Sequence, residues 1–225
     1  MKRLIPTDKE WFNYKKNKHC SVLFAFITYS ATFYNGKLYY PKEKYIRDIE
    51  LLKKVTGLKN KKSIHTYKNK LIDLGYITED KKNFYPINRI DTTYILIDKV
   101  LLYNLCTTES KLSVPIFVYL MDKMNMKQKV YKENTYNFTI KELKEMLGYS
   151  TLSQNKTIES KITDCLKELQ SKEYIKYNKV FVESEKSAKG NYKIPNYLLT
   201  YVFENKKEQP QEIITYEKKE SGFVF

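Results

Sequence analysis

The sequence contains few of the residues from which metal sites and disulfide frameworks are built. In 225 residues there are three cysteines and two histidines, and no spacing among them resembles a zinc site. An odd number of cysteines, far apart in the chain, favours buried thiols in a reducing cytosol over disulfide bonds. We therefore expect neither a metal ion nor any other cofactor. The five residues are Cys20, Cys106, Cys165, His19 and His65.

Glycine and arginine are also scarce, and this excludes several classes of enzyme. None of the six glycines belongs to a phosphate-binding loop of the Walker or dinucleotide type. The only arginines are Arg3, Arg47 and Arg89, which are too scattered for the arginine-rich site of a tyrosine recombinase. No His-x-His pair stands beside a tyrosine, as a nicking initiator would need. We predict that the protein is not an enzyme.

Long apolar runs are missing as well. No stretch approaches the roughly 18 apolar residues of a membrane span, and residues 1–16 are too polar for a signal peptide. A low content of proline and glycine, with a hydrophobic fraction of 42%, predicts folded domains. The protein is expected in the cytoplasm and not at a membrane.

Lysine, in contrast, is abundant. The formal net charge is +15, which favours a polyanionic partner because neutralising phosphates releases counterions. Residues 1–92 carry 20 basic and 9 acidic residues, or +11, whereas residues 93–225 carry 21 and 17, or +4. Part of the lysine content fits the codon usage of an AT-rich genome. The first part of the chain is the stronger candidate for binding nucleic acid.

The chain approximately repeats itself. Apolar residues and glycines recur in the same order at offsets of 91 to 98 residues. Chance matching of apolar residues is the alternative, but the order and type of the elements agree as well as single letters. The paired segments are 21–27 with 113–119, 52–57 with 143–148, 64–77 with 162–175, and 94–102 with 191–199.

Each repeat predicts the element order of a winged helix, which is helix, strand, helix, turn, helix and hairpin. Asn35-Gly36, Gly57 and Gly75 are expected to end helices, since glycine tolerates positive φ. Thr139 and Glu142 form a capping-box pattern at a helix start. In the first repeat, helices are predicted at 19–33, 46–56 and 61–74, with strands at 37–40, 76–78 and 84–87. In the second, helices are predicted at 111–124, 139–147 and 156–171, with strands at 136–138, 174–177 and 180–183.

We therefore predict a mainly α fold with small β-wings, formed by two tandem winged-helix domains related by internal duplication. Residues 1–92 form domain 1, the principal DNA reader, and residues 93–204 form domain 2. The link between the repeats carries a strand at 94–97. Residues 205–225 form a polar C-terminal tail, which is either a recruitment peptide or a frayed terminus.

The third helix of domain 1 is the expected recognition helix, because this helix of a helix-turn-helix enters the major groove. Residues 59–70 include five lysines and no acidic residue. Asparagine can form hydrogen bonds with adenine, threonine can contact a thymine methyl group, and lysine can bind phosphate. The alternative is that these residues form an ordinary solvated helix face. For the histidine, a phosphate or base contact is preferred to a metal role. The predicted contacts are Lys59, Asn60, Lys61, Lys62, His65, Thr66, Lys68, Asn69 and Lys70, with Lys81 and Lys82 at the wing tip.

Domain 2 is the weaker candidate, because Glu159, Asp164 and Glu168 stand among the lysines of its third helix. Two interpretations stay open, a second DNA reader and a dimerisation domain. Its predicted DNA contacts are Ser153, Gln154, Asn155, Lys156 and Lys161.

The sequence resembles plasmid and phage replication initiators of low-GC Gram-positive bacteria, several of which carry two winged helices. The resemblance covers residues 19–200 and is carried by an apolar helix, then TIKELKEMLGY, then a lysine-rich helix ending in LIDLGYI or LKELQSKEYI. The segments YILIDKVLL and NYKIPNYLL are similar to the short motif before an initiator's first helix. The resemblance implies an initiator that binds direct repeats in double-stranded DNA at an origin, bends or helps to melt AT-rich DNA, recruits host replication proteins and is associated with the nucleoid or a plasmid. A homodimer is a separate expectation, which follows from the dimerisation interpretation of domain 2.

Two other functions fit the same pattern. A dimeric transcriptional regulator would bind one palindromic operator over a promoter, whereas an initiator would bind several spaced repeats. A partition or adaptor protein would keep its protein partner after Lys61, Lys62 and Asn69 are changed to alanine.

Overall fold

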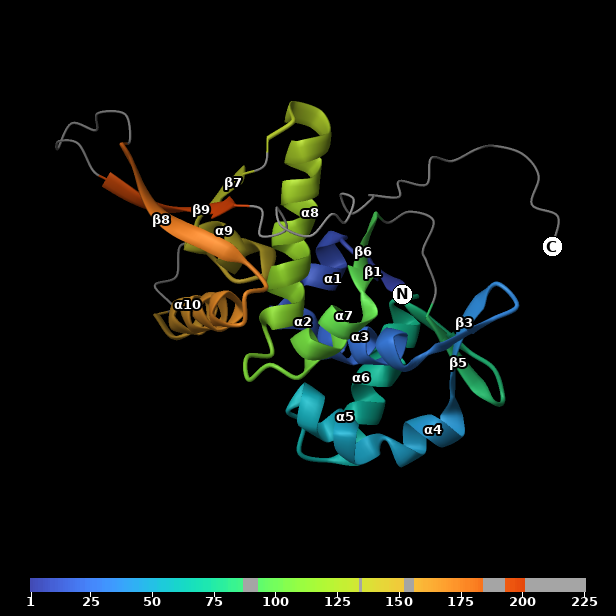
Figure 1. The fold of residues 1–225 in the computed structure, drawn as a ribbon. Helices are drawn as coiled ribbons and strands as arrows, with labels where there is room; N and C mark the ends of the chain where they lie inside the picture. Colours follow the sequence, from blue (N-terminus) through green and yellow to red (C-terminus); the bar gives the residue numbers. More distant parts are fainter. Residues whose placement is uncertain (87–92, 134, 152–155, 184–192, 201–225) are drawn as a thin grey trace.

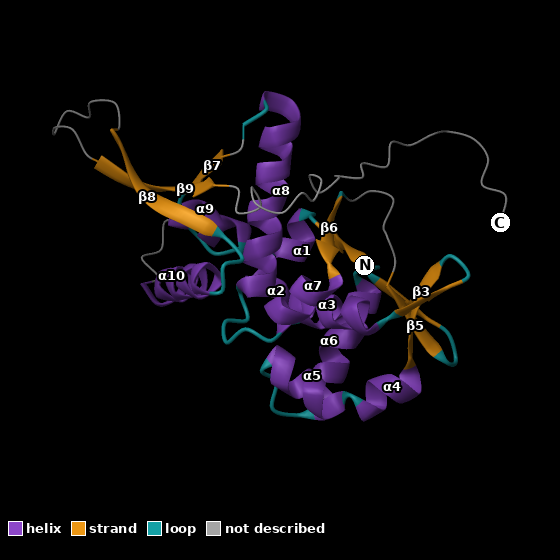
Figure 2. Ribbon diagram, viewed as in Figure 1, coloured by secondary structure: helices purple, strands orange, loops and turns teal. Residues whose placement is uncertain are grey.

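The computed structural model describes residues 1–86, 93–133, 135–151, 156–183 and 193–200 (Figures 1 and 2). The first unit, residues 1–86, contains β1 (Lys2–Pro6), α1 (Lys9–Phe12), α2 (Tyr14–Asn17), α3 (Cys20–Ser30), β2 (Thr32–Tyr34), β3 (Lys37–Pro41), α4 (Lys42–Arg47), α5 (Ile49–Thr56), α6 (Lys61–Asp73), β4 (Ile77–Glu79) and β5 (Asn83–Pro86). The second unit, residues 93–200, contains β6 (Tyr94–Asp98), α7 (Lys99–Cys106), α8 (Ser113–Tyr131), β7 (Thr135–Phe138), α9 (Ile140–Met146), α10 (Lys156–Ser171), β8 (Lys176–Glu183) and β9 (Lys193–Thr200).

Helix α3 is buried on nearly every side, as its almost continuous apolar sequence predicts. It packs against α5 and α6 of its own unit and against α7 and α8 of the second unit. The hydrophobic core is continuous as a result, running from Ile5 in β1 through Phe24 in α3 and Phe117 in α8 to Leu166 in α10. All three cysteines are buried and free, as predicted.

Strand β1 was not predicted, and it ties the start of the chain to the second unit. It pairs with β6 in antiparallel register, from Lys2 opposite Asp98 to Pro6 opposite Tyr94. Arg3, on this strand, is buried and donates hydrogen bonds to the carbonyl oxygens of Thr28 (3.0 Å) and Ala31 (3.0 Å) at the end of α3. A cation is favourable there, because the carbonyl end of a helix carries partial negative charge.

The two wing sheets have the same strand order. In the first unit β3 pairs with β5 and β5 with β4, and in the second β7 pairs with β9 and β9 with β8. In both, the strand before the helix-turn-helix lies beside the last strand of the unit. The first sheet has an additional edge strand, β2, on the other side of β3.

The role predicted for Asn35-Gly36 is wrong. Helix α3 ends at Ser30, and Asn35 (φ 47°) and Gly36 (φ 74°) form the turn of the hairpin between β2 and β3. Positive φ at both central residues is what a two-residue hairpin turn with the twist of its strands requires. The helix expected at 46–56 is also divided at Asp48, which separates α4 from α5 and accepts a hydrogen bond from the hydroxyl of Tyr40 (2.7 Å).

The second wing also differs from its prediction. Residues 176–183 form one strand, β8, whose partner is β9 at 193–200, so the expected hairpin at 174–183 is wrong. Residues 94–102 and 191–199 are not equivalent either, because β6 pairs with β1 and leads into α7, whereas β9 lies inside the wing sheet. The tail at 205–225 lies outside the described residues.

Several predicted elements are found with nearly their predicted bounds. Helix α10 begins and ends as predicted, and α6 differs by one residue. Thr139 caps α9, accepting a hydrogen bond from the backbone N–H of Glu142 (3.0 Å). In the part of the chain that the structure describes, no helix combines the length and apolar character needed to cross a bilayer.

Candidate nucleic-acid interface

Helices α5 and α6 form a helix-turn-helix. Helix α5 ends at Gly57, which has φ 71° and so supplies the left-handed residue that closes the helix. Asn60 then caps α6, because its side-chain oxygen accepts a hydrogen bond from the backbone N–H of Ser63 (2.8 Å). The side-chain oxygen of Asn60 is thus already used within the protein, and the adenine contact predicted for this residue stays a prediction.

One face of α6 is open. Ile64 and Leu71 are completely buried, and these inward residues leave the opposite side chains in solvent. The hydroxyl of Thr66 donates to the carbonyl oxygen of Lys62 (3.0 Å), which leaves its methyl group free to point outward. The exposed residues of the predicted set are Lys59, Asn60, Lys61, Lys62, Thr66 and Asn69.

Two lysines of α6 that are predicted DNA contacts bind other residues of the protein. The side chain of Lys68 is only 11% exposed, and its Nζ lies 3.8 Å from a carboxylate oxygen of Glu79 and 5.2 Å from the ring centre of Phe84. Lys70 donates to the backbone carbonyl oxygen of Lys16 (2.7 Å) in α2. The expectation that the ammonium group of Lys68 projects outward is wrong, whereas Lys70 is half-buried and makes its contact at the surface.

His65 lies at the edge of the open face. Its ring is half-buried against Tyr45 of α4, with the tyrosine hydroxyl 3.3 Å from Nδ1. Burial, followed by the charges of Lys61 and Lys68, lowers the pKa of His65, so the ring is neutral at pH 7. A neutral imidazole offers one N–H donor, which suits a phosphate or base acceptor.

The wing of the first unit carries two further predicted contacts. Lys81 and Lys82 are exposed at its tip, between β4 and β5. The acidic residues beside them, Glu79 and Asp80, were not among the predicted site residues. Both make contacts that shape the wing, and the D-x-x-N pattern at 80–83 is a local signal for such a turn.

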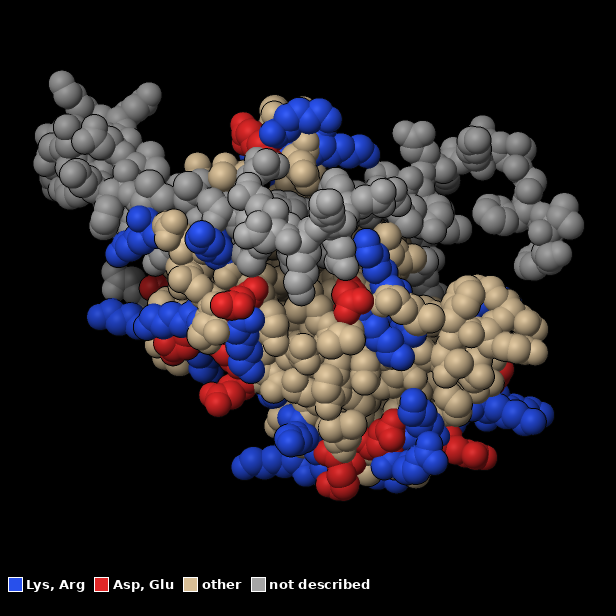
Figure 3. Space-filling view, viewed as in Figure 1, with Lys and Arg blue, Asp and Glu red and all other residues tan. Residues whose placement is uncertain are grey.

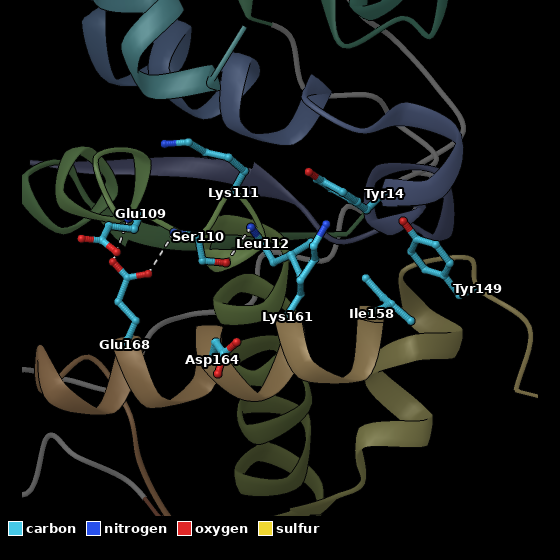
Figure 4. Close-up of a pocket in the computed structure, with 10 residues that line it drawn as sticks. All are labelled: Tyr14, Glu109, Ser110, Lys111, Leu112, Tyr149, Ile158, Lys161, Asp164 and Glu168. Carbon is cyan, nitrogen blue, oxygen red and sulfur yellow. Dashed lines mark hydrogen bonds between the residues drawn. The ribbon is translucent and has the colours of Figure 1, made fainter. Parts of the chain in front are cut away.

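In the second unit, α10 exposes Lys156 and Lys161, and two of its three acidic residues make contacts within the protein. Glu159 forms an ion pair with the buried Lys144 (2.7 Å). Glu168 accepts hydrogen bonds from the backbone N–H groups of Glu109 (2.8 Å) and Ser110 (2.9 Å), as Figure 4 shows. The third, Asp164, is exposed, so the surface of α10 carries charges of both signs. Ser153, Gln154 and Asn155 lie outside the described residues.

The turns of the two helix-turn-helix segments are each contacted by the other unit. A β-carbon at Gly57 would lie 3.4 Å from Cε of Lys111, and one at Gly148 would overlap the side-chain oxygen of Asn13. A cavity of about 440 Å³ opens at this junction, with Tyr14, Tyr149 and Lys161 among its lining residues (Figure 4). The orientation of α6 relative to α10 is thus fixed by direct contacts near both turns.

Basic and acidic side chains are mixed on the face drawn in Figure 3. Lysine and arginine gather along its lower edge, over α4 and α5, with acidic side chains between them. The run of residues at 59–70, in contrast, has no acidic member.

Comparison with known proteins gives one match. Residues 95–221 match the model of the family described as "Initiator Replication protein, WH1". This range begins in β6 and includes the second helix-turn-helix and its wing strands. Searches among curated proteins and among solved structures returned no match.

Proposed function

The chain belongs to the initiator replication protein WH1 family, and from this premise we propose that it starts plasmid replication by binding repeated double-stranded sequences at an origin. The observation that carries the proposal is the open face of α6, which lies in a helix-turn-helix beside a lysine-tipped wing. Phosphate contacts from lysine give affinity, and side chains that reach base edges give specificity. The proposal assigns the protein no enzymatic step.

We propose further that the two units are tandem winged helices that arose by duplication. The matched family region lies on the second unit, and the first unit has the same order of helices and strands once its additional elements, α2, β2 and α4, are left out. The identical strand order of the two wing sheets supports this, because such an order is not required by the number of strands. We infer that the first unit is also a winged helix from its similarity to the second unit, on which most of the matched region lies.

The first unit is assigned the main reading role. Its residues carry most of the net positive charge, and Asn69 lies exposed on α6 where it can approach adenine. For the second unit we propose supporting phosphate contacts from Lys156 and Lys161, since both are exposed and two of the three acidic residues of α10, Glu159 and Glu168, already have partners within the protein.

Footprinting on the DNA that flanks the gene tests the proposal. We expect several protected repeats of even spacing beside an AT-rich stretch, because an initiator loads many copies on one origin. One palindrome over a promoter would favour a dimeric transcriptional regulator instead. Absence of any duplex binding at low salt would contradict both.

A pair of double variants connects the footprint to α6. Lys61 and Lys62 are changed together to alanine, and Lys127 and Lys129 on α8 serve as the matched control with the same loss of charge. We expect the α6 variant to lose the footprint and the α8 variant to retain it. Equal losses would indicate that net charge alone drives binding.

A further inference from the structure

An acidic residue occupies the tip of the wing, where phosphates are expected. Asp80 follows the last residue of β4 and immediately precedes Lys81 and Lys82, and all three are exposed. A carboxylate at this position repels a DNA backbone and partly cancels the charge of the lysines beside it. Its presence requires a compensating role.

The contacts of Asp80 supply that role. Its Oδ1 accepts hydrogen bonds from the backbone N–H groups of Lys82 (2.7 Å) and Asn83 (2.7 Å). Its Oδ2 accepts one from the hydroxyl of Tyr85 (2.5 Å), across the hairpin. Charged acceptors form the stronger class of hydrogen bond, and an aspartate that binds the N–H groups two and three residues ahead fixes the turn. One side chain thus determines the path of the backbone through both lysines.

The base of the wing is fastened to two helices. Nζ of Lys42, at the start of α4, lies 2.7 Å from a carboxylate oxygen of Glu79, and Lys68 of α6 approaches the same oxygen at 3.8 Å. Both ammonium groups also lie 5.2 Å from the ring centre of Phe84. The backbone N–H of Lys42 donates to the carbonyl oxygen of Lys82 (2.9 Å). The wing therefore holds a set position relative to α6.

We propose that Asp80 is a positioning residue for DNA binding, which presets the wing tip so that Lys81 and Lys82 reach the backbone beside the groove entered by α6. This rests on the proposed function of the first unit. Ordering a loose wing on the DNA would cost conformational entropy with every binding event, and a preformed turn avoids that cost. Glu79 and Asp80 then serve the geometry of the wing, and both of their charges are matched by donors within the protein.

If the proposal holds, removal of the Asp80 carboxylate changes DNA affinity in the direction opposite to that expected from charge alone. Removing a negative charge next to DNA would by itself strengthen binding. If the carboxylate positions the lysines, Asp80→Ala weakens binding although the protein becomes more positive. Asp73, exposed at the end of α6, provides the matched control, because Asp73→Ala makes the same change of charge outside the wing turn.

The experiment measures affinity of the full chain for a fluorescent duplex of about 20 base pairs, roughly two helical turns, by anisotropy at several salt concentrations. We expect Asp73→Ala to bind as tightly as the unchanged protein or slightly more tightly. Asp80→Ala should bind about 3- to 10-fold more weakly, with a shallower salt dependence, because phosphate contacts are lost. Asp80→Asn should stay within about twofold, since its amide oxygen can accept the same two backbone hydrogen bonds.

A second measurement keeps the test independent of overall folding. Tyr85→Phe removes one donor to Asp80 without any change of charge, and we expect faster hydrogen exchange at the amides of Lys82 and Asn83 together with about two- to threefold weaker binding. Binding by Asp80→Ala as tight as that of Asp73→Ala would overturn the proposal, as would unchanged exchange and affinity in Tyr85→Phe. If the unchanged protein ignored duplexes, the proposed function would fail instead.

Discussion

The side-chain oxygen of Asn13 occupies the position that a β-carbon would take at Gly148. Because Gly148 also has φ +80°, two separate costs oppose any side chain there. We expect Gly148→Ala to lower the free energy of unfolding by about 2–5 kcal/mol, the sum of backbone strain and overlap. Gly36→Ala is the control, since Gly36 has φ +74° but nothing lies within 4 Å of an added β-carbon. Its cost should be only about 1–2 kcal/mol, as measured by urea denaturation. Similar losses in both variants would show that the contact with Asn13 contributes nothing.

Lys62 and Lys68 lie on the same helix but should respond to truncation in different ways. Lys68→Ala removes a largely buried side chain that contacts Glu79 and Phe84, so we expect a loss of about 1–2 kcal/mol in the free energy of unfolding. Lys62→Ala should leave stability within about 0.5 kcal/mol, because the residue is exposed. It should instead weaken DNA binding on every sequence alike. Denaturation and anisotropy together separate the two effects, and a reversed pattern would contradict the assignment of either residue.

Asn69 is expected to read a base. Its side chain is exposed on α6, and an amide is suited to a bidentate contact with adenine. Asn69→Ala should cost about 1–3 kcal/mol on a footprinted repeat and nothing on a random duplex. Competition binding with the two duplexes gives both values. Equal losses on the two would remove Asn69 from base readout.

Asp122 predicts an unusual dependence of stability on pH. Desolvation by burial raises the pKa of Asp122 to about 6, against the opposing effects of Lys123 and a hydrogen bond with Thr7. Since the folded-state pKa exceeds the unfolded value of about 4, the folded protein binds this proton more tightly. The contribution of Asp122 to stability therefore falls as pH rises from about 4 to about 6 and stays low above that range.

Asp122→Asn tests this dependence. The variant does not titrate at this site, so we expect it to be more stable than the unchanged protein at pH 7, by up to about 3 kcal/mol. The advantage should shrink as pH falls through the range from about 6 to about 4. Denaturation curves of the two proteins from about pH 4 to about pH 8 give the difference in their free energies of unfolding. A difference that does not vary with pH would contradict a titrating Asp122.

Much of the fold could be predicted where local signals agree. The bounds of α6 and α10 follow from apolar periodicity and from turn residues at their ends. Strand β1 could not be predicted in the same way, because its partner β6 lies about ninety residues away and no local pattern specifies that pairing. Asn35-Gly36 carried a usable signal that was misjudged, since this dipeptide is the strongest short-range indicator of a hairpin.

Which side chains of the candidate site are exposed could be predicted in outline but not residue by residue. Lys68 stands four residues after Ile64 and three before Leu71, so helical spacing alone places it on the buried side. The phosphate contact was predicted from the lysine content of residues 59–70, although the position of Lys68 in the helix indicated burial. The capping role of Asn60 was also readable, because asparagine before a helix usually caps it. The turn made by Asp80 depends on Tyr85 across the hairpin, a contact that spacing along the chain only partly indicates.

The hydrophobic core passes without interruption from β1 through α3 and α8 to α10, and this has a consequence for how the molecule responds to heat and to load. Neither unit can unfold while the other stays folded, because they share one core. Calorimetry should therefore record one endothermic peak instead of two. For the same reason the two units should move as one rigid body, so that α10 keeps its position relative to a duplex bound at α6.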